Sequence, residues 1–212
     1  MSAIDILEDL DGYEVNSLEP LQRVLLVTDG TLTEILEANF FERIRLVQVS
    51  QRIVPAGDDH ALLDLVAGEA VSERKILLQG VDSRRNYVYA ESMIALDRLS
   101  PAFREELLNS RTPPGRLWLE QRPETSKELM EIRGQRANGL CAYFECNNAA
   151  PMLARTYRIS SAGQPLIVTT EYFPAAYQSF AERTSSKLDQ LAGSCRRARS
   201  RNLSASRPSA IA

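Results

Sequence analysis

The sequence predicts an α+β domain built on a single antiparallel sheet with helices packed on one side of it. Two hairpin patterns support this prediction: residues 73–80 and 87–95 flank one polar turn, and residues 154–161 and 165–173 flank another. Short helical patterns lie between the hairpins and do not alternate singly with strands, which favours antiparallel pairing. The 212 residues suffice for one sizeable domain and are short for two.

Two helices and a strand are predicted before the first hairpin. Pro20 suits the first position of a helix that ends near Gly30. Residues 31–34 (TLTE) form a capping-box pattern, in which a hydroxyl and a carboxylate satisfy free backbone N–H groups, and they predict a second short helix. Residues 43–54 alternate in polarity and are rich in β-branched side chains, which predicts a strand.

Two more helices are predicted between the hairpins. Ser100 and Pro101 are typical of an N-cap followed by a first helical residue. Residues 125–128 (TSKE) form another capping-box pattern, which predicts a helix that continues through Ile132. Between these helices, the sequence RTPPGRLW predicts a stiff loop.

Charge is distributed unevenly and suggests three segments. Residues 1–18 are an acidic lead-in, residues 19–182 form the predicted domain, and residues 183–212 are a basic tail that we expect to be disordered. The last 20 residues carry five arginines and no acid, so the total charge of −3 leaves −8 on residues 1–192. Such an acidic body argues against a nucleic-acid-binding surface.

Several classes of protein and site have little support in the sequence. Three cysteines (Cys141, Cys146 and Cys195) and a single histidine, His60, do not form a disulfide framework, a zinc motif or an evident catalytic triad. Glycine-rich nucleotide-binding motifs and long apolar runs are absent from the sequence, and its N-terminus is acidic. We therefore expect a cytoplasmic protein with no membrane segment, whose chemistry depends on carboxylates, arginines and backbone groups.

Two charged residues alternate in phase with apolar neighbours. Arg74 shares its strand face with Ile76, and Glu171 shares its face with Ile167. A charge on a buried face costs several kcal/mol unless it is paired or used. Either the two charges reach water at strand ends or pair structurally, or they are an anion-binding arginine and a sheltered carboxylate.

Five motifs follow one another along the chain: DGTLTEIL (29–36), ERKILLQG (73–80), YAESMIALDRL (89–99), TPPGRL (112–117) and RTYRISSAGQPLIVTTEYFP (155–174). Together they resemble the chorismate pyruvate-lyase family, over about residues 20–175. The resemblance is closest to the branch that supplies 4-hydroxybenzoate for phenolic glycolipids and related products. It implies a chorismate lyase-like fold, with the ligand enclosed beneath helical flaps.

The resemblance also implies an activity and a site. The family removes pyruvate from chorismate and leaves 4-hydroxybenzoate, with no metal or redox cofactor. Because chorismate carries two carboxylates, its site needs cations and backbone N–H donors. By resemblance, Arg74 forks onto the ring carboxylate, Glu171 faces the ring hydroxyl, and Leu32 lines the site.

This chain departs from the family pattern at two places. Pro114 stands where the family residue donates its backbone N–H to the carboxylate, and proline has no N–H. Either Gly115 replaces that donor or the affinity is lower. In the ubiquinone-pathway branch the glutamate falls at the position of Thr170, and a slip of one residue would turn the side chain to the other face of the sheet.

Two other functions remain open. The effector-binding domains of certain transcription regulators share this fold, but they normally follow a DNA-binding helix-turn-helix, whereas about 20 acidic residues precede the domain here. A chorismatase-type enzyme would give an isomeric hydroxybenzoate. For the enzyme we expect chorismate and 4-hydroxybenzoate as the small-molecule partners, no nucleic-acid or membrane partner, and a monomer or weak homodimer.

Overall fold

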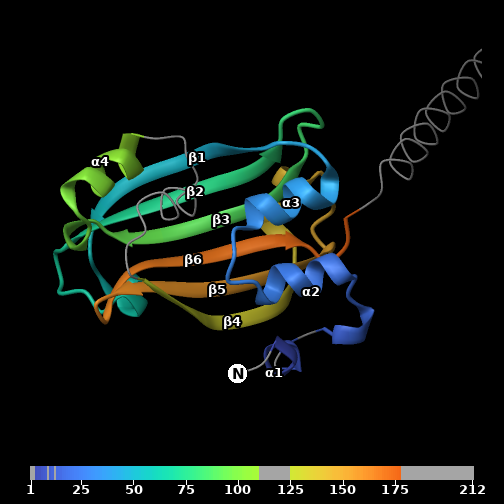
Figure 1. Ribbon diagram of the computed structural model, residues 1–212, viewed down its shortest axis with the longest axis horizontal. Helices are drawn as coiled ribbons and strands as arrows, with labels where there is room; N and C mark the ends of the chain where they lie inside the picture. Colours follow the sequence, from blue (N-terminus) through green and yellow to red (C-terminus); the bar gives the residue numbers. More distant parts are fainter. Residues whose placement is uncertain (1–2, 9, 12, 110–124, 178–212) are drawn as a thin grey trace, which may run out of the picture. The chain divides into compact units, whose positions relative to one another are not determined.

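A computed structural model describes residues 3–8, 10–11, 13–109 and 125–177. These residues form one antiparallel sheet with the strand order β1-β2-β3-β6-β5-β4 (Figure 1). The strands are β1 (Ile44–Pro55), β2 (Ala70–Gly80), β3 (Asn86–Ala95), β4 (Ser126–Arg136), β5 (Pro151–Ser161) and β6 (Gln164–Pro174). The predicted α+β class and single antiparallel sheet are therefore confirmed.

Both predicted hairpins are present, and pairing between β3 and β6 joins them at the centre of the sheet. In the β5–β6 turn, Ala162 and Gly163 both have positive φ values, 48° and 76°. Two consecutive left-handed residues match the twist of the flanking strands, which is why such turns are favoured in tight hairpins. The β3–β6 register places Ala90 opposite Glu171, which fixes the face to which each side chain points.

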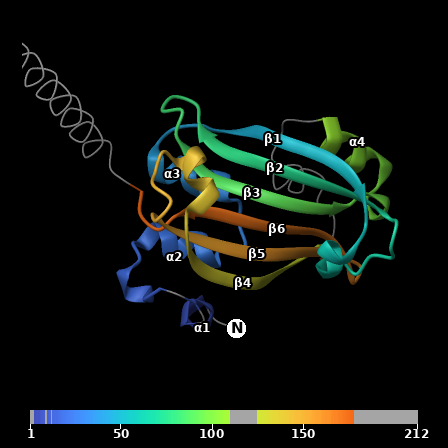
Figure 2. The same ribbon diagram turned by 180° about the vertical axis from the view of Figure 1, so that it is seen from behind.

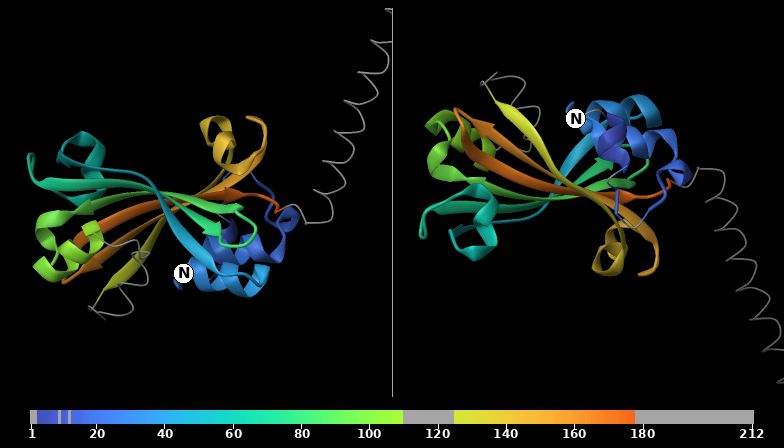
Figure 3. Two further views of the ribbon diagram at one scale, coloured as in Figure 1. Left: turned by 90° about the horizontal axis from the view of Figure 1, so that it is seen from above. Right: turned by 90° about the horizontal axis from the view of Figure 1, so that it is seen from below.

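Three helices cover one face of the sheet, which we call the inner face: α2 (Pro20–Val27), α3 (Leu32–Phe40) and α4 (Pro101–Asn109) (Figures 1 and 3). Pro20 opens α2 as predicted. The Phe103 backbone N–H donates to Ser100 Oγ at 3.3 Å, so the predicted N-cap of α4 is also present. Thr31 precedes α3 but makes no side-chain capping bond, so the capping box predicted there is wrong.

An apolar cluster fixes α4 on the inner face. Phe103 and Leu107 of α4 pack with Ile94 of β3 and Ile167 of β6, and all four are buried. The segments α2 and α3 cover the other end of the same face, where Leu25, Leu26 and Leu36 are fully buried. The middle of the inner face lies between these two helical regions (Figure 1).

The opposite face, which we call the outer face, carries shorter segments (Figures 2 and 3). They are η2 (Asp58–Leu63), η4 (Asn138–Leu140) and α6 (Cys141–Phe144). Leu63 of η2 packs on Val71 and Val168, and Tyr143 of α6 stacks on Tyr89 at 5.0 Å. The prediction of helices on one side is thus confirmed for the three longer helices, while shorter helical segments lie on the other side.

The helix predicted to start at Thr125 is wrong, because this segment forms strand β4 along the edge of the sheet. A β-bulge between Leu129 and Glu131 is the cause. It lets Leu129 and Ile132 both reach the inner face although they are three residues apart, which is the spacing of a helical stripe. Pairing with β5 along the strand then overrides the local helical preference.

The acidic residues at the N-terminus contain ordered structure, namely α1 (Ala3–Glu8) and η1 (Val15–Ser17). The Gly134 N–H of β4 donates to the Asp11 carbonyl at 2.7 Å, and a Cβ atom at Gly134 would collide with the Tyr13 ring. This segment therefore contacts the free edge of β4. A short turn, η3 (Leu96–Arg98), joins β3 to α4, and the predicted basic tail lies outside the described residues.

Candidate functional site

Two rows of paired residues cross the middle of the inner face. The first row runs from Arg74 on β2 through the other strands, in the order Arg74, Ser92, Thr169 and Tyr157. The second row, two residues along each strand, contains Ile76, Ala90, Glu171 and Arg155. Directly paired residues share a face, so all eight side chains belong to the inner face, including the two charges singled out in the sequence.

Arg74 is 1% exposed, and its guanidinium has no protein partner among the described residues. This applies to all three nitrogens, Nε, Nη1 and Nη2. Burial lowers the pKa of Arg74 from its usual value, since water no longer stabilises the charge. A buried guanidinium with five unused donors is costly to the folded state and is well suited to bind a planar anion.

Glu171 is 7% exposed and both of its oxygens are engaged. Arg155 Nε donates to Glu171 Oε2 at 2.6 Å, and the Tyr157 hydroxyl donates to Glu171 Oε1 at 3.1 Å. The ion pair places a cation beside the carboxylate and balances its charge within the protein. Burial, followed by the negative charge of Glu171, raises the pKa of Tyr157, so the phenol keeps its proton as a donor.

Arg155 links this network to the segment between α2 and α3. Its side chain is 1% exposed, and Nη1 donates to the Thr28 carbonyl at 2.7 Å. Its remaining nitrogen, Nη2, is buried and has no partner among the described residues. Arg155 therefore orients Glu171 while one of its nitrogens, Nη2, keeps both N–H donors unused.

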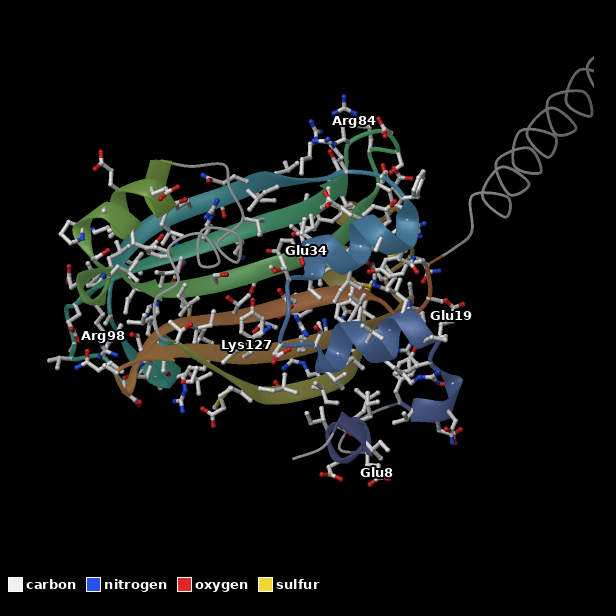
Figure 4. The ribbon with its side chains drawn as sticks, viewed as in Figure 1. Glu8, Glu19, Glu34, Arg84, Arg98 and Lys127 are labelled. Atoms are coloured by element: carbon white, nitrogen blue, oxygen red, sulfur yellow. The ribbon has the colours of Figure 1, made fainter. Side chains whose placement is uncertain are left out.

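Lys127 of the edge strand β4 lies beside the same network, and along the strands it lies between the positions of Arg98 and Arg84 (Figure 4). Its Nζ is 4.2 Å from the centre of the Tyr157 ring and 3.4 Å from the carbonyl oxygens of Thr28 and Asp29. Burial and, secondarily, the charge of Arg155 lower the pKa of Lys127 to about 8.

The structure brings Arg74 and Glu171 to one face but does not pair them with each other. Thr170 points to the outer face, where its hydroxyl lies 2.9 Å from that of Thr156. Leu32 is buried at the first residue of α3, one of the helices over the inner face. Pro114 and Gly115 lie outside the described residues.

Sequence reasoning missed Arg155, Tyr157 and Lys127. The alternation that singled out Arg74 also applies to Arg155, which shares its strand face with Leu153 and Ile159, so that signal was available. Lys127 was hidden because its segment was expected to be helical, and a lysine in the first turn of a surface helix needs no explanation.

His60 lies away from the inner face. It is buried in η2, where Nδ1 accepts a hydrogen bond from Gly57 N–H at 3.1 Å and Nε2 lies 3.2 Å from Glu73. Within the ranges that the structure describes, histidines, cysteines and carboxylates do not gather in groups of three or more that could hold a metal ion. Nor do these ranges contain a helix long and apolar enough to cross a membrane.

Comparisons with known families and with known proteins both identify chorismate pyruvate-lyases. Residues 26–181 match the family model described as chorismate pyruvate-lyase Rv2949c-like. A chorismate pyruvate-lyase of Mycobacterium tuberculosis is 33% identical over 168 residues, which cover 77% of this chain and 84% of that protein. A chorismate pyruvate-lyase of Mycobacterium leprae is 32% identical over 165 residues, which cover 77% and 79%.

Solved structures with a similar fold include PhnF and a domain of a repressor. PhnF from Mycobacterium smegmatis has a TM-score of 0.56 at 14% identity over 70% of this chain, and the match spans 65% of the length of PhnF. The C-terminal domain of the histidine utilization repressor from Pseudomonas syringae has a TM-score of 0.51 at 17% identity, covering 65% of this chain and 96% of that domain. At these identities the likeness concerns the fold alone.

Proposed function

This chain belongs to the chorismate pyruvate-lyase Rv2949c-like family, and from that membership we propose that it is a lyase that converts chorismate to 4-hydroxybenzoate and pyruvate. The observation that carries the proposal is the buried Arg74, whose three nitrogens have no partner among the described residues. A planar carboxylate on the substrate would satisfy this guanidinium with two parallel hydrogen bonds.

The proposed reaction needs no further reactant. The bond between the ring carbon and the enol-ether oxygen breaks, and its electron pair leaves with the oxygen. The neighbouring ring carbon, which bears the hydroxyl, loses its proton, and the electrons of that C–H bond complete the aromatic ring. The released enolpyruvate takes up a proton on its methylene carbon and becomes pyruvate, so chorismate supplies every atom of both products.

Positioning and electrostatics can supply much of the catalysis, because formation of an aromatic ring provides a large driving force. We assign Arg74 to the ring carboxylate and Glu171 to the ring hydroxyl. Each Glu171 oxygen has a second lone pair beyond the bonds from Arg155 and Tyr157, so the carboxylate can also accept from the substrate hydroxyl.

Other parts of the proposed site come from the family resemblance. Leu32 would line the site from the start of α3. Gly115 would supply the backbone N–H that Pro114 lacks. We further propose that the reaction uses neither a metal nor a redox cofactor. Incubation with a chelator should therefore leave pyruvate release unchanged, and loss of activity that a divalent ion restores would contradict this part of the proposal.

A second function, from a different class, is a non-catalytic domain that binds a small effector. The fold shared with the C-terminal domain of the histidine utilization repressor favours it, since a repressor is a regulatory protein. An effector domain needs to bind an anion but has no use for a carboxylate held firmly beside the site. The ion-paired Glu171 therefore favours the lyase.

The deciding experiment is to incubate the purified chain with chorismate, measure pyruvate with a coupled dehydrogenase assay, and identify the aromatic product by chromatography. The lyase predicts equal amounts of pyruvate and 4-hydroxybenzoate, and Arg74→Ala serves as the matched negative control. An isomeric hydroxybenzoate would indicate the chorismatase alternative. Binding of the aromatic acid without any pyruvate release would indicate the effector domain.

A further inference from the structure

The inner face holds a second group of cations that lies across the sheet from Arg74. Arg155 and Lys127 belong to β5 and β4, whereas Arg74 belongs to β2. Strands β3 and β6 lie between β2 and β5, which separates the backbones of these two strands by about 14 Å at the usual inter-strand spacing. The two arginines therefore approach the inner face from opposite sides and can bind two different groups.

We propose that Lys127 Nζ and Arg155 Nη2 together bind the second carboxylate of chorismate, the one on its enol-ether arm. This inference rests on the proposed function, and it adds a specificity-determining residue, Lys127, to the site. The carboxylate on the arm is present in chorismate but absent from 4-hydroxybenzoate, so the pair would distinguish the substrate from its aromatic product.

Unused donors support this assignment. Arg155 Nη2 is buried without a partner among the described residues, although the other two nitrogens of Arg155 are bonded. The contacts from Lys127 Nζ to the Thr28 and Asp29 carbonyls, at 3.4 Å each, are longer than the usual 2.7–3.2 Å of an N–H···O bond. Lys127 is therefore held near the network with its donors poorly satisfied.

The charges around Lys127 and Arg155 also favour a bound carboxylate. The Tyr157 ring centre lies 4.2 Å from Lys127 Nζ and 5.5 Å from Arg155 Cζ, so one ring is shared by two cations. Glu171 is already ion-paired with Arg155 and leaves one positive charge in excess in this group. Burial and the Arg155 charge lower the pKa of Lys127, against smaller opposing effects of Glu171 and Asp29. A carboxylate placed between the two cations would relieve their repulsion.

The competing interpretation is purely structural, in which Lys127 only ties β4 to the segment after α2 through the Thr28 and Asp29 carbonyls. The two interpretations predict different effects of a Lys127 substitution on ligand affinity. If Lys127 is only structural, its loss should weaken the binding of every ligand of the site to the same degree. If Lys127 binds the second carboxylate, its loss should weaken only ligands that carry that carboxylate.

The test compares Lys127→Met with Lys75→Met, using KM for chorismate and the dissociation constant of 4-hydroxybenzoate. Lys75 is a matched control because it is a β2 lysine, 47% exposed in its side chain, that pairs with Glu91 on the outer face. We expect Lys127→Met to raise KM for chorismate about 10-fold or more, as expected for loss of a hydrogen bond between charged groups. Affinity for 4-hydroxybenzoate should change less than about 2-fold, and Lys75→Met should change neither constant.

A pH series gives a second readout. In the unmodified protein, KM for chorismate should rise as the pH increases above about 8, because Lys127 loses its proton there. In Lys127→Met this rise should disappear. An unchanged KM in Lys127→Met, or equal weakening of chorismate and 4-hydroxybenzoate, would overturn the inference while leaving the lyase intact. If the unmodified protein released no pyruvate, the proposed function itself would fail.

Discussion

The two rows across the inner face have the same residue type at their opposite ends, Arg74 at one and Arg155 at the other, but the two charges are balanced differently. Arg74 and Arg155 are each 1% exposed, but Arg155 has an ion pair and a backbone acceptor, whereas Arg74 has no partner among the described residues. At the Arg155 end the protein balances its own charge and fixes the position of Glu171. At the Arg74 end we propose that a ligand carboxylate balances the charge, so a substitution there should weaken binding without lowering stability.

The largest expected effect of this difference is on stability. Arg155→Met should lower the free energy of unfolding by about 3–5 kcal/mol, because Glu171 would remain buried without its cation. Arg74→Met should cause no loss, or a gain, since it replaces a buried charge that has no partner among the described residues. Urea denaturation measures the free energy of unfolding of both variants. Equal losses of stability would show that Arg74 and Arg155 are balanced to the same degree within the protein.

The second expected effect concerns binding. Arg74→Ala should weaken binding of chorismate by about 2–5 kcal/mol, because the ring carboxylate loses its bidentate partner within a desolvated site. Arg74→Lys should restore only part of this loss, since an ammonium group cannot reproduce the planar fork of a guanidinium. Calorimetric titration with 4-hydroxybenzoate, which carries the same ring carboxylate and is not turned over, measures the loss of this contact. Near-normal affinity of Arg74→Ala for 4-hydroxybenzoate would show that Arg74 does not bind the ring carboxylate.

Arg74 and Arg155 also differ in how much of their role could be predicted from the sequence. Period-two alternation was enough to identify Arg74 and Glu171 as charges on buried strand faces, because each lies where the pairing of its own strand with β3 or β5 is regular. It did not show that Glu171 pairs with Arg155, although both lie in the hairpin predicted from residues 154–161 and 165–173. Which residues face each other in that hairpin depends on a register shift between Ile159 and Ser160, which the local pattern does not reveal. The pairing of β3 with β6, which brings Arg74 and Glu171 to one face, is likewise a property of the whole sheet and not of any one segment.

Lys127 illustrates a different limit. One bulged residue in β4 shifts the alternation, and the apolar positions then imitate a helix. The TSKE pattern added a local helical signal, which is weak compared with pairing along a whole strand. Lys127 was therefore assigned to the wrong type of element, and its position beside Arg155 could not be recognised from the sequence.

The third prediction tests whether Glu171 acts on the substrate or only balances Arg155. Glu171→Gln keeps the shape and a hydrogen bond but removes the negative charge, so turnover should fall by about 100-fold or more, while KM changes little. Thr170→Val is the register control. Because Thr170 lies on the outer face with Thr156, we expect near-normal turnover. A severe defect in Thr170→Val combined with a mild one in Glu171→Gln would indicate a strand slipped by one residue.

The smallest expected effect is the pH dependence of stability at the Arg155 end. Lys127 has a pKa of about 8 in the folded protein, compared with 10.5 for a lysine in water. Below pH 8 both states hold the proton, and the folded state bears the cost of a partly buried charge. Between about pH 8 and 10.5 the unfolded chain keeps the proton that the folded protein has released, so this group makes the protein more stable as the pH rises.

Lys127→Met removes that dependence, because methionine keeps the length of the side chain but has no charge to bury. The variant should therefore be more stable than the unmodified protein at about pH 7, and the difference should shrink steadily toward about pH 10. Urea denaturation of both proteins at several pH values measures this difference, with Lys75→Met as the exposed control. A difference that stayed constant across the range would mean that Lys127 is not destabilised by burial beside Arg155.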